Sequence, residues 1–245
     1  MDPRLGWESH TFTIVGRCPR TGMLGIALTS SPLCVAARCV FVRANVGAVA
    51  TQAYAHPGLG PLGLRLLEMD YAPAKILAEL RATDASPEHR QIGIVDRHGA
   101  AAVFTGEKNL DWKGHIADRN FVAMGNYLTS GAVVDTMAEA FRTSESEILE
   151  ERLLRAIEAG KAAGGERGGQ LSAGLVVYGT DTYPRTDLRV DMYDRRTAPG
   201  DDAVSELRRI FAEYRPLIPY YEQRPTNPGL PSWRDWREQH PTYAP

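Results

Sequence analysis

Two alternating segments near the start of the chain, residues 11–17 and 23–31, constrain the fold most. Hydroxyl residues alternate with apolar ones at the start of the first segment, which is the period of a strand, and the second is an apolar run that ends in Thr-Ser-Ser. The Pro-Arg-Thr-Gly turn between them is too short to join parallel strands. We therefore predict an antiparallel hairpin that brings together the hydroxyl side chains of Thr11, Thr13, Ser30 and Ser31. Such a cluster is where we look first for a nucleophile.

The rest of the sequence predicts strands and helices in blocks. Strand patterns occur at 46–52, 90–95, 100–105, 121–126, 171–178 and 187–192, and the turn at 96–99 makes 90–105 a second hairpin. Helical spacing of apolar residues occurs at 61–69, 73–81, 131–160 and 204–214. Strands flanked by consecutive helix pairs favour sheets stacked between helical layers over a doubly wound fold. Short connections between strands predict mainly antiparallel sheets, so the expected fold class is α+β.

Composition argues against several classes of protein. The 28 basic and 30 acidic residues are interspersed, so no positive surface for a nucleic-acid backbone is expected. No run approaches the roughly 20 apolar residues of a bilayer-spanning helix, and residues 1–10 lack the apolar core of a signal peptide. Three cysteines without C-x-x-C spacing fit reduced thiols. We expect a cytoplasmic globular protein that has no nucleic-acid or membrane partner.

The end of the chain differs in composition from the rest. Residues 215–245 are rich in proline and aromatic residues and show no core-forming periodicity. We therefore divide the chain into a leader (1–10), a domain (11–214) and a C-terminal extension (215–245). The extension carries Trp233, Trp236 and several arginines, which are residue types enriched at protein interfaces. They favour a homodimer or larger homo-oligomer over a loosely packed terminus.

A series of motifs over residues 11–212 resembles one bacterial family, domain of unknown function 1028, of the N-terminal-nucleophile (Ntn) hydrolase superfamily. In chain order the motifs are TFTIVGR, TGMLGIA, RANVGAVATQ, GLGPLGLRLL, EHRQIGIVD, WKGH, MGN, and AGGE followed by LSAGLVV. The resemblance implies a four-layer αββα sandwich of mainly antiparallel sheets. That architecture agrees with the layers expected from the order of strands and helices.

The resemblance also implies a reaction. In the superfamily, a Thr, Ser or Cys that begins the mature chain attacks an amide carbonyl, and its own α-amine, of ordinary pKa about 8, accepts the proton. It implies Thr11 as the nucleophile of a small-molecule amidohydrolase for an amide, ureido or cyclic imide C–N bond, with Thr13 and Ser30 nearby. Family members often begin with Met followed directly by this Thr, whereas ten residues precede Thr11 here. Either the leader is removed, or the chain is a precursor, or another residue is the nucleophile. The alternative is that Thr11 and Thr13 are ordinary strand threonines.

Other polar residues are candidates for the same site. Gln52 ends an apolar strand, and Asn126 follows a glycine with a permissive backbone, so either amide could stabilise an oxyanion. Candidates expected to bind or orient a substrate from loops and strand ends are His56, His115, Glu166 and Ser172. The alternative for each is a hydrogen-bonded loop cap or a solvated side chain.

Single arginines are the candidates for binding a substrate carboxylate, since no cluster of basic residues indicates a phosphate. They are Arg17, Arg38, Arg43, Arg90 and Arg167. Arg43 and Arg90 are favoured because they lie beside predicted strands. The alternative for each is a surface ion pair of little energetic weight.

Neither a metal nor a cofactor is expected. The six histidines are scattered without H-x-x-x-H or Cys-His spacing. Residues 58–63 have the spacing G-x-G-x-x-G, but Pro61 and the absence of an acidic residue at the ribose-binding distance argue against a dinucleotide site.

Two other functions remain open alongside the amidohydrolase. A non-catalytic binding or scaffold protein would keep the sandwich and the uncut leader, and Ser30-Ser31 stands where relatives often have Ser-Lys. A hydrolase with an internal Ser or Thr nucleophile would need a base such as His56 or His115 within hydrogen-bond reach. The fold alone does not decide between them.

Overall fold

The computed structural model describes residues 10–194 and 201–240, and its strands form two sheets. The six-stranded sheet has the order β10 (Thr186–Val190), β9 (Ser172–Tyr178), β2 (Leu24–Ser30), β1 (Thr11–Arg17), β8 (Phe121–Asn126), β7 (Gly114–Asp118). The four-stranded sheet has the order β3 (Val40–Arg43), β4 (Gly47–Ala53), β5 (Arg90–Asp96), β6 (Ala101–Thr105). All of these neighbouring strands pair antiparallel. The expected α+β class with antiparallel sheets is confirmed.

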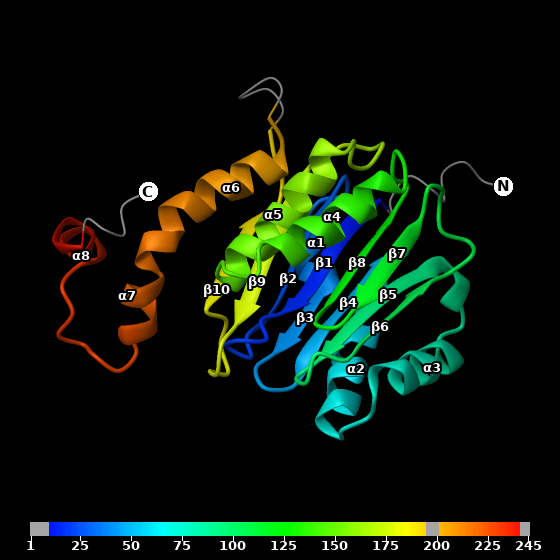
Figure 1. Cartoon of the computed structure of the whole chain (residues 1–245), viewed down its shortest axis with the longest axis horizontal. Coiled ribbons are helices and arrows are strands. Elements are labelled where there is room, and N and C mark those ends of the chain that lie inside the picture. The colour runs from blue at the N-terminus through cyan, green and yellow to red at the C-terminus, as the bar shows by residue number, and fades with distance from the viewer. Residues whose placement is uncertain (1–9, 195–200, 241–245) are drawn as a thin grey trace.

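Helices cover the outer face of each sheet (Figure 1). The six-stranded sheet shares an apolar core with α4 (Ala132–Thr143), α5 (Leu149–Ala162) and α6 (Ala203–Tyr214). The four-stranded sheet shares another with α2 (Leu59–Glu68) and α3 (Pro73–Thr83). Short helices lie at connections and in the C-terminal extension: α1 (Val35–Cys39), η1 (Pro87–His89), η2 (Arg215–Leu217), α7 (Ile218–Gln223) and α8 (Trp233–Gln239).

The alternation in β1 explains how the two sheets face each other. Phe12 and Ile14 are fully buried on the helix side, whereas Val15 belongs to a third apolar cluster that lies between the sheets. Successive strand residues point to opposite faces, so Thr11 and Thr13 share the inter-sheet face with Val15. The space between the sheets is therefore apolar along most of its length and polar where β1 begins.

Most predicted elements are confirmed. The first hairpin places Thr11 opposite Ser30, and the second pairs β5 with β6. One prediction fails. The region around His115, expected to be a loop, is edge strand β7, whose side chains are largely exposed and whose backbone pairs with β8. An edge strand with one exposed face has too few buried apolar residues to show a clear strand pattern.

The C-terminal extension shows a feature that its sequence pattern did not indicate. Leu217, Tyr220 and Trp236 form a small apolar cluster of their own, with Leu230 packed against it. The segment, whose sequence shows no core-forming periodicity, therefore has a small core that is separate from those of the sheets. Figure 1 shows α7 and α8 projecting away from both sheets. Trp233 is 41% exposed, and its role in contact with a second subunit remains a prediction.

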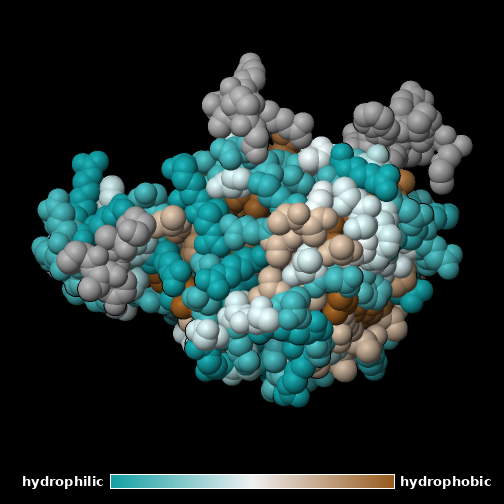
Figure 2. All heavy atoms as spheres, turned by 45° about the horizontal axis from the view of Figure 1, so that its top comes forward, coloured by the Kyte–Doolittle hydropathy of each residue, from teal (hydrophilic) through white to brown (hydrophobic). Residues whose placement is uncertain are grey.

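The surface agrees with a chain that buries its apolar residues within the domain. Figure 2 shows a face covered mostly by hydrophilic residues, with apolar side chains gathered mainly in the right half of the view. In the parts of the chain that the structure describes, no helix combines the length and apolar character needed to cross a bilayer.

Candidate functional site

The polar end of the inter-sheet space gathers the five residues predicted to be catalytic. β1 lies between β2 and β8, so Thr11 is opposite both Ser30 and Asn126. Thr13 donates its hydroxyl proton to Gln52 Oε1, which reaches across from β4 of the other sheet. All five side chains lie in residues that are at most 3% exposed. Residues far apart in the sequence thus form one buried polar cluster.

Gln91 on β5 lies at the centre of this cluster. Its Oε1 accepts hydrogen bonds from Gln52 Nε2 at 2.8 Å and Asn126 Nδ2 at 3.2 Å. Its Nε2 donates to Thr105 Oγ1 at 2.8 Å, and to the carbonyl oxygens of residues 125 and 114 at 3.0 and 3.1 Å. One amide therefore connects both sheets and fixes the orientation of the other two.

The side-chain amides of Gln52 and Asn126 hold the backbone of the candidate nucleophile. Gln52 Nε2 lies 3.2 Å and Asn126 Nδ2 3.5 Å from the carbonyl oxygen of Thr11. Their N–H groups thus point at Thr11 and Gln91, and their part as oxyanion donors stays a prediction.

The hydroxyl of Thr11 belongs to a short chain of hydrogen bonds. Thr11 Oγ1 lies 3.0 Å from Ser30 Oγ, and Ser30 Oγ donates to the carbonyl oxygen of His10. A serine hydroxyl has one proton, so with that proton on the His10 carbonyl, Ser30 accepts from Thr11. The Thr11 hydroxyl is thereby connected through Ser30 to the carbonyl of the peptide bond that precedes it.

A cleft of about 840 Å³ is lined by His10 and Ser31, the residues next to Thr11 and Ser30 in the chain. Its lining residues are His10, Ser31, Pro32, Leu33, Arg38, Ala53, Tyr54, Ala55, Pro57 and Gly168. Ala53 has φ +66°, and Tyr127, which stacks on the His10 ring at 4.0 Å, has φ +54°. Non-glycine residues in this strained region of backbone conformation cluster at ligand sites, so their position supports a functional role for the cleft.

His10 and Ser31 form a second polar pair at the edge of the cleft. Their Nδ1 and Oγ atoms are 3.0 Å apart. A Cβ atom at residue 168 would lie 2.7 Å from both of these atoms, so only glycine allows that loop to pack against the pair. The geometry suits proton transfer between a serine and an imidazole.

Glu166 lies behind this loop with its carboxyl buried. The residue is 4% exposed, and neither carboxyl oxygen has a hydrogen bond of normal geometry within the described chain. Gly164 and Gly165, with φ +116° and +58°, turn the chain sharply after α5 and carry it to this position. Burial raises the pKa of Glu166 well above its usual value, although the Ser31 N–H opposes the shift. Burial thus favours the neutral form of this carboxyl.

The remaining candidates for substrate binding are distributed differently from the prediction. His115 Nδ1 lies 2.8 Å from Thr105 Oγ1, which joins it to the far side of the cluster, and burial lowers the pKa of His115. Ser172 Oγ donates to the Pro32 carbonyl at 2.7 Å and accepts from Val35 N at 3.2 Å. Ser172 thus holds the loop that lines the cleft and does not face it.

Two favoured arginines and one histidine have other partners. Arg43 pairs with Glu68 on the surface, at the end of the four-stranded sheet remote from Gln52. Arg90 forms a buried pair with Asp84, at 2.6 Å, and donates to the Tyr54 carbonyl. His56 Nδ1 accepts the backbone N–H of residue 58. Of the three, only Arg90 acts on the cleft, by holding the backbone of a lining residue.

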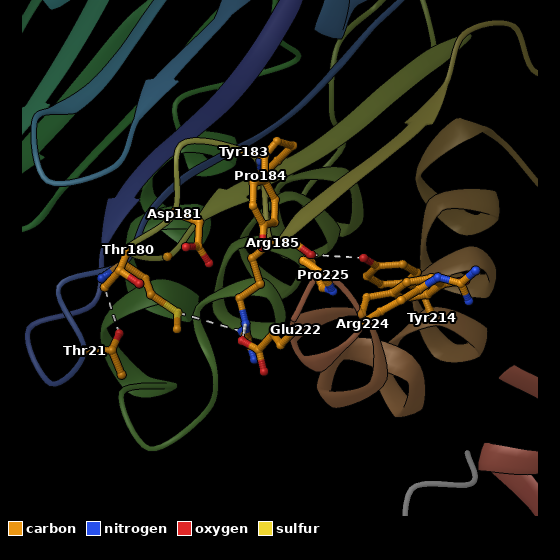
Figure 3. Close-up of a pocket in the computed structure, with 13 residues that line it drawn as sticks. Thr21, Thr180, Asp181, Tyr183, Pro184, Arg185, Tyr214, Glu222, Arg224 and Pro225 are labelled. Atoms are coloured by element: carbon orange, nitrogen blue, oxygen red, sulfur yellow. Dashed lines mark hydrogen bonds and ion pairs between the residues drawn. The ribbon is translucent and has the colours of Figure 1, made fainter. Parts of the chain in front are cut away.

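A second cleft, of about 570 Å³, lies near the opposite ends of β1 and β2 (Figure 3). Arg185 in this cleft pairs with Glu150 and Glu222, each at 2.7 Å, and its carbonyl accepts a hydrogen bond from Tyr214. Burial raises the pKa of Tyr214 to about 12. Arg185 is thus neutralised by its two acidic partners, and the cleft lies at the opposite ends of β1 and β2 from the hydroxyl cluster, so it is a weaker candidate.

Sequence reasoning missed two residues of the site. Gln91 is a polar residue on the inter-sheet face of an otherwise apolar strand, a signal that could have found it. His10 precedes the first strand and had no motif to mark it. In the described residues, no group of three or more His, Cys, Asp or Glu side chains is placed to hold a metal ion.

Comparisons with known proteins give the relationship of the chain. Residues 11–199 match the family of unknown function DUF1028. The crystal structure of protein SPO2555 from Silicibacter pomeroyi, described as DUF1028, shares 29% identity over 93% of each chain, with a TM-score of 0.75. Anbu, the ancestral β-subunit from Yersinia bercovieri, shares 11% identity over 90% of this chain and 98% of that one, with a TM-score of only 0.36. No curated protein matches the chain. The chain therefore belongs to the DUF1028 family.

Proposed function

We propose that this protein is a small-molecule amidohydrolase of the Ntn type, with Thr11 as its nucleophile once the leader is removed. The observation that carries the proposal is the link from the Thr11 hydroxyl through Ser30 to the carbonyl oxygen of His10. The two antiparallel sheets between helices support it, since the resembled superfamily has a four-layer αββα sandwich with its nucleophile on the first strand.

The first step is cleavage of the bond between His10 and Thr11. Thr11 Oγ attacks the carbonyl carbon of His10, passing its proton to Ser30 as Ser30 gives its own proton to the carbonyl oxygen. The C–N bond then breaks, the Thr11 nitrogen takes a proton, and an ester joins His10 to the Thr11 oxygen. Water hydrolyses this ester, which releases the leader and leaves a free α-amine on Thr11.

The second step repeats this chemistry on a substrate. The α-amine of Thr11 accepts the hydroxyl proton while Oγ attacks an amide, ureido or imide carbonyl, and it then protonates the departing nitrogen. Ser30 donates to the oxyanion in the place where it now bonds the His10 carbonyl. Gln52 and Asn126 keep the Thr11 backbone in position. Water then hydrolyses the acyl ester and restores the hydroxyl.

Intact-mass measurement and N-terminal sequencing of the purified protein test the first step. We expect a chain that begins at Thr11, and a Thr11→Ala variant that keeps its full length. Thr136→Ala, which alters a half-buried helix threonine bonded to the carbonyls of Ala132 and Ala159, is the matched control and should be processed normally. An unchanged protein that remains full-length would contradict self-cleavage.

A separate experiment tests the catalysis. A chain encoded as Met followed directly by Thr11, from which Met aminopeptidase removes the Met, presents the α-amine without self-cleavage. We expect it to hydrolyse members of a panel of amides, ureido compounds and cyclic imides, and its Thr11→Ala counterpart to hydrolyse none. Absence of turnover in this form would favour the non-catalytic scaffold.

A second candidate is a hydrolase that uses Ser31 as an internal nucleophile. The observation in its favour is the 3.0 Å contact between Ser31 Oγ and His10 Nδ1 at the edge of the cleft. The histidines first considered, His56 and His115, contact other groups. This mechanism requires the uncut leader, because His10 is lost on cleavage before Thr11. A full-length chain that loses turnover on Ser31→Ala but not on Thr11→Ala would establish it.

A further inference from the structure

We infer that the cleft beside Thr11 binds substrates through a carboxylate, which pairs with Arg38. This inference names the substrate class for the proposed hydrolase and therefore rests on that function: an amide or ureido compound with a carboxylate at one end and an apolar or aromatic group at the other.

Four of the five candidate arginines already have partners. Arg43 and Arg90 form ion pairs with acidic side chains. Arg17 donates to the Arg97 carbonyl at 2.7 Å and to Asn120 Oδ1 at 3.1 Å. Arg167 donates to the Leu128 carbonyl at 3.2 Å and lies over the Tyr127 ring. These guanidinium groups serve the fold, and binding a substrate would disturb existing contacts.

Arg38 differs from these four arginines both in its partners and in its position. Its guanidinium makes no hydrogen bond or ion pair with any residue of the described ranges, and its side chain lines the cleft. An unpaired guanidinium at the wall of a cleft presents a fork of N–H donors that matches a carboxylate in charge and shape.

The charge of the cleft favours an anion over a cation. Among the described residues that line it, none is Asp or Glu, so no acidic side chain competes for Arg38. Glu166, on the loop before residue 168, is 4% exposed and does not line the cleft, and burial raises the pKa of its carboxyl. The unopposed positive charge should therefore attract and orient a carboxylate.

The remaining walls favour an apolar or planar group. Tyr54 is 52% exposed and Leu33 45% exposed, and proline and alanine side chains fill the intervals between them. These exposed apolar side chains offer a surface against which an apolar or planar group can pack. With Ser31 on the same wall and Ser30 next to it in the chain, the scissile carbonyl would lie between the carboxylate end and the apolar end.

The test uses two probes that contain no C–N bond and so cannot be cleaved as amides. 3-Benzoylpropanoate carries a phenyl ketone and a carboxylate, and butyrophenone is its neutral counterpart with a methyl group instead. Binding of each to the protein as purified is measured by NMR titration. We expect the carboxylate to bind at least about fivefold more tightly. Arg38→Gln should abolish that difference, whereas Arg65→Gln, an equal change of charge at an exposed helix position outside the cleft, should preserve it.

Equal affinity for the two probes, no saturable binding of the carboxylate, or a preference that survives Arg38→Gln would overturn the inference. The proposed function fails separately. Arg38-dependent binding by a protein that cleaves no amide would leave the carboxylate site standing without the hydrolase. Cleavage of amides with no effect of charge would leave the hydrolase and remove the carboxylate site. If both hold, Arg38→Gln should raise KM for N-benzoylglycine with little change in kcat, because the contact is equal in ground and transition states.

Discussion

Replacing Gln91 with leucine tests whether one amide holds the polar cluster together. Leucine has roughly the same volume as glutamine. The substitution removes the two accepted and three donated hydrogen bonds of the Gln91 side chain, in a residue that is 0% exposed. A typical buried hydrogen bond contributes about 1 kcal/mol net, and polar groups left without a partner cost more. Gln52 and Asn126 keep one acceptor each, on Thr11, which limits the loss. We expect Gln91→Leu to lower the free energy of unfolding by about 3–5 kcal/mol.

Urea unfolding followed by circular dichroism measures this loss, with the free energy taken from the midpoint and slope. Gln223→Leu is the matched control, because Gln223 is exposed and makes one hydrogen bond, to the Pro219 carbonyl within its own helix. It should change the stability by less than about 0.5 kcal/mol. A loss below about 1 kcal/mol for Gln91→Leu would refute the central role of this amide.

Three further predictions concern the candidate residues. Because burial raises the pKa of Glu166, the folded chain keeps a proton that the unfolded chain loses above about pH 4.3, so this group lowers stability as pH rises from that value toward the folded pKa. Glu166→Gln should therefore be more stable than the unchanged protein at pH 7, with the gain shrinking toward pH 4 in urea unfolding, and a gain independent of pH would contradict this. Arg90→Met should cost about 3–5 kcal/mol in thermal unfolding, because it leaves the carboxyl of Asp84, 4% exposed, without its partner. Arg43→Met removes an exposed pair and should cost less than about 1 kcal/mol, so equal losses for the two arginines would count against the burial argument. Ser172→Ala should lower stability by about 1–2 kcal/mol, measured in the same way, and a larger effect on turnover than on stability would show that it is more than a loop anchor.

Local patterns predicted the elements well where one face is buried. The alternation in β1 and β2 set their hairpin and placed Thr11 beside Ser30, because a residue's face on a strand follows from its parity. Edge strand β7 was missed, since backbone pairing with β8 specifies it more than side-chain burial does. The cluster around Trp236 was missed because it joins residues of two short helices that have no sustained period.

The roles of single side chains were harder to predict. The expectation that Gln52 and Asn126 stabilise an oxyanion carried no information on their hydrogen-bond partners, which the structure gives as Thr11 and Gln91. Arg43 and Arg90 were favoured for their place beside strands, yet each has an acidic partner supplied by a different element. A partner brought by the packing of another element leaves no mark in the local sequence.

The sequence by itself determined the strands and helices, the antiparallel pairing of hairpin neighbours, and the residue types able to carry amide chemistry, because these depend on periodicity and short connections. Only the tertiary structure decided which partners each polar side chain contacts. The packing of strands and sheets brought three polar side chains that are distant in the sequence, those of Ser30, Gln52 and Asn126, into hydrogen bonds with Thr11. It also gave most of the described arginines a partner, while Arg38 lines a cleft without a partner among the described residues. Hydrogen bonds and ion pairs between distant segments depend on separations of a few ångströms, and these are set only when the whole core is packed.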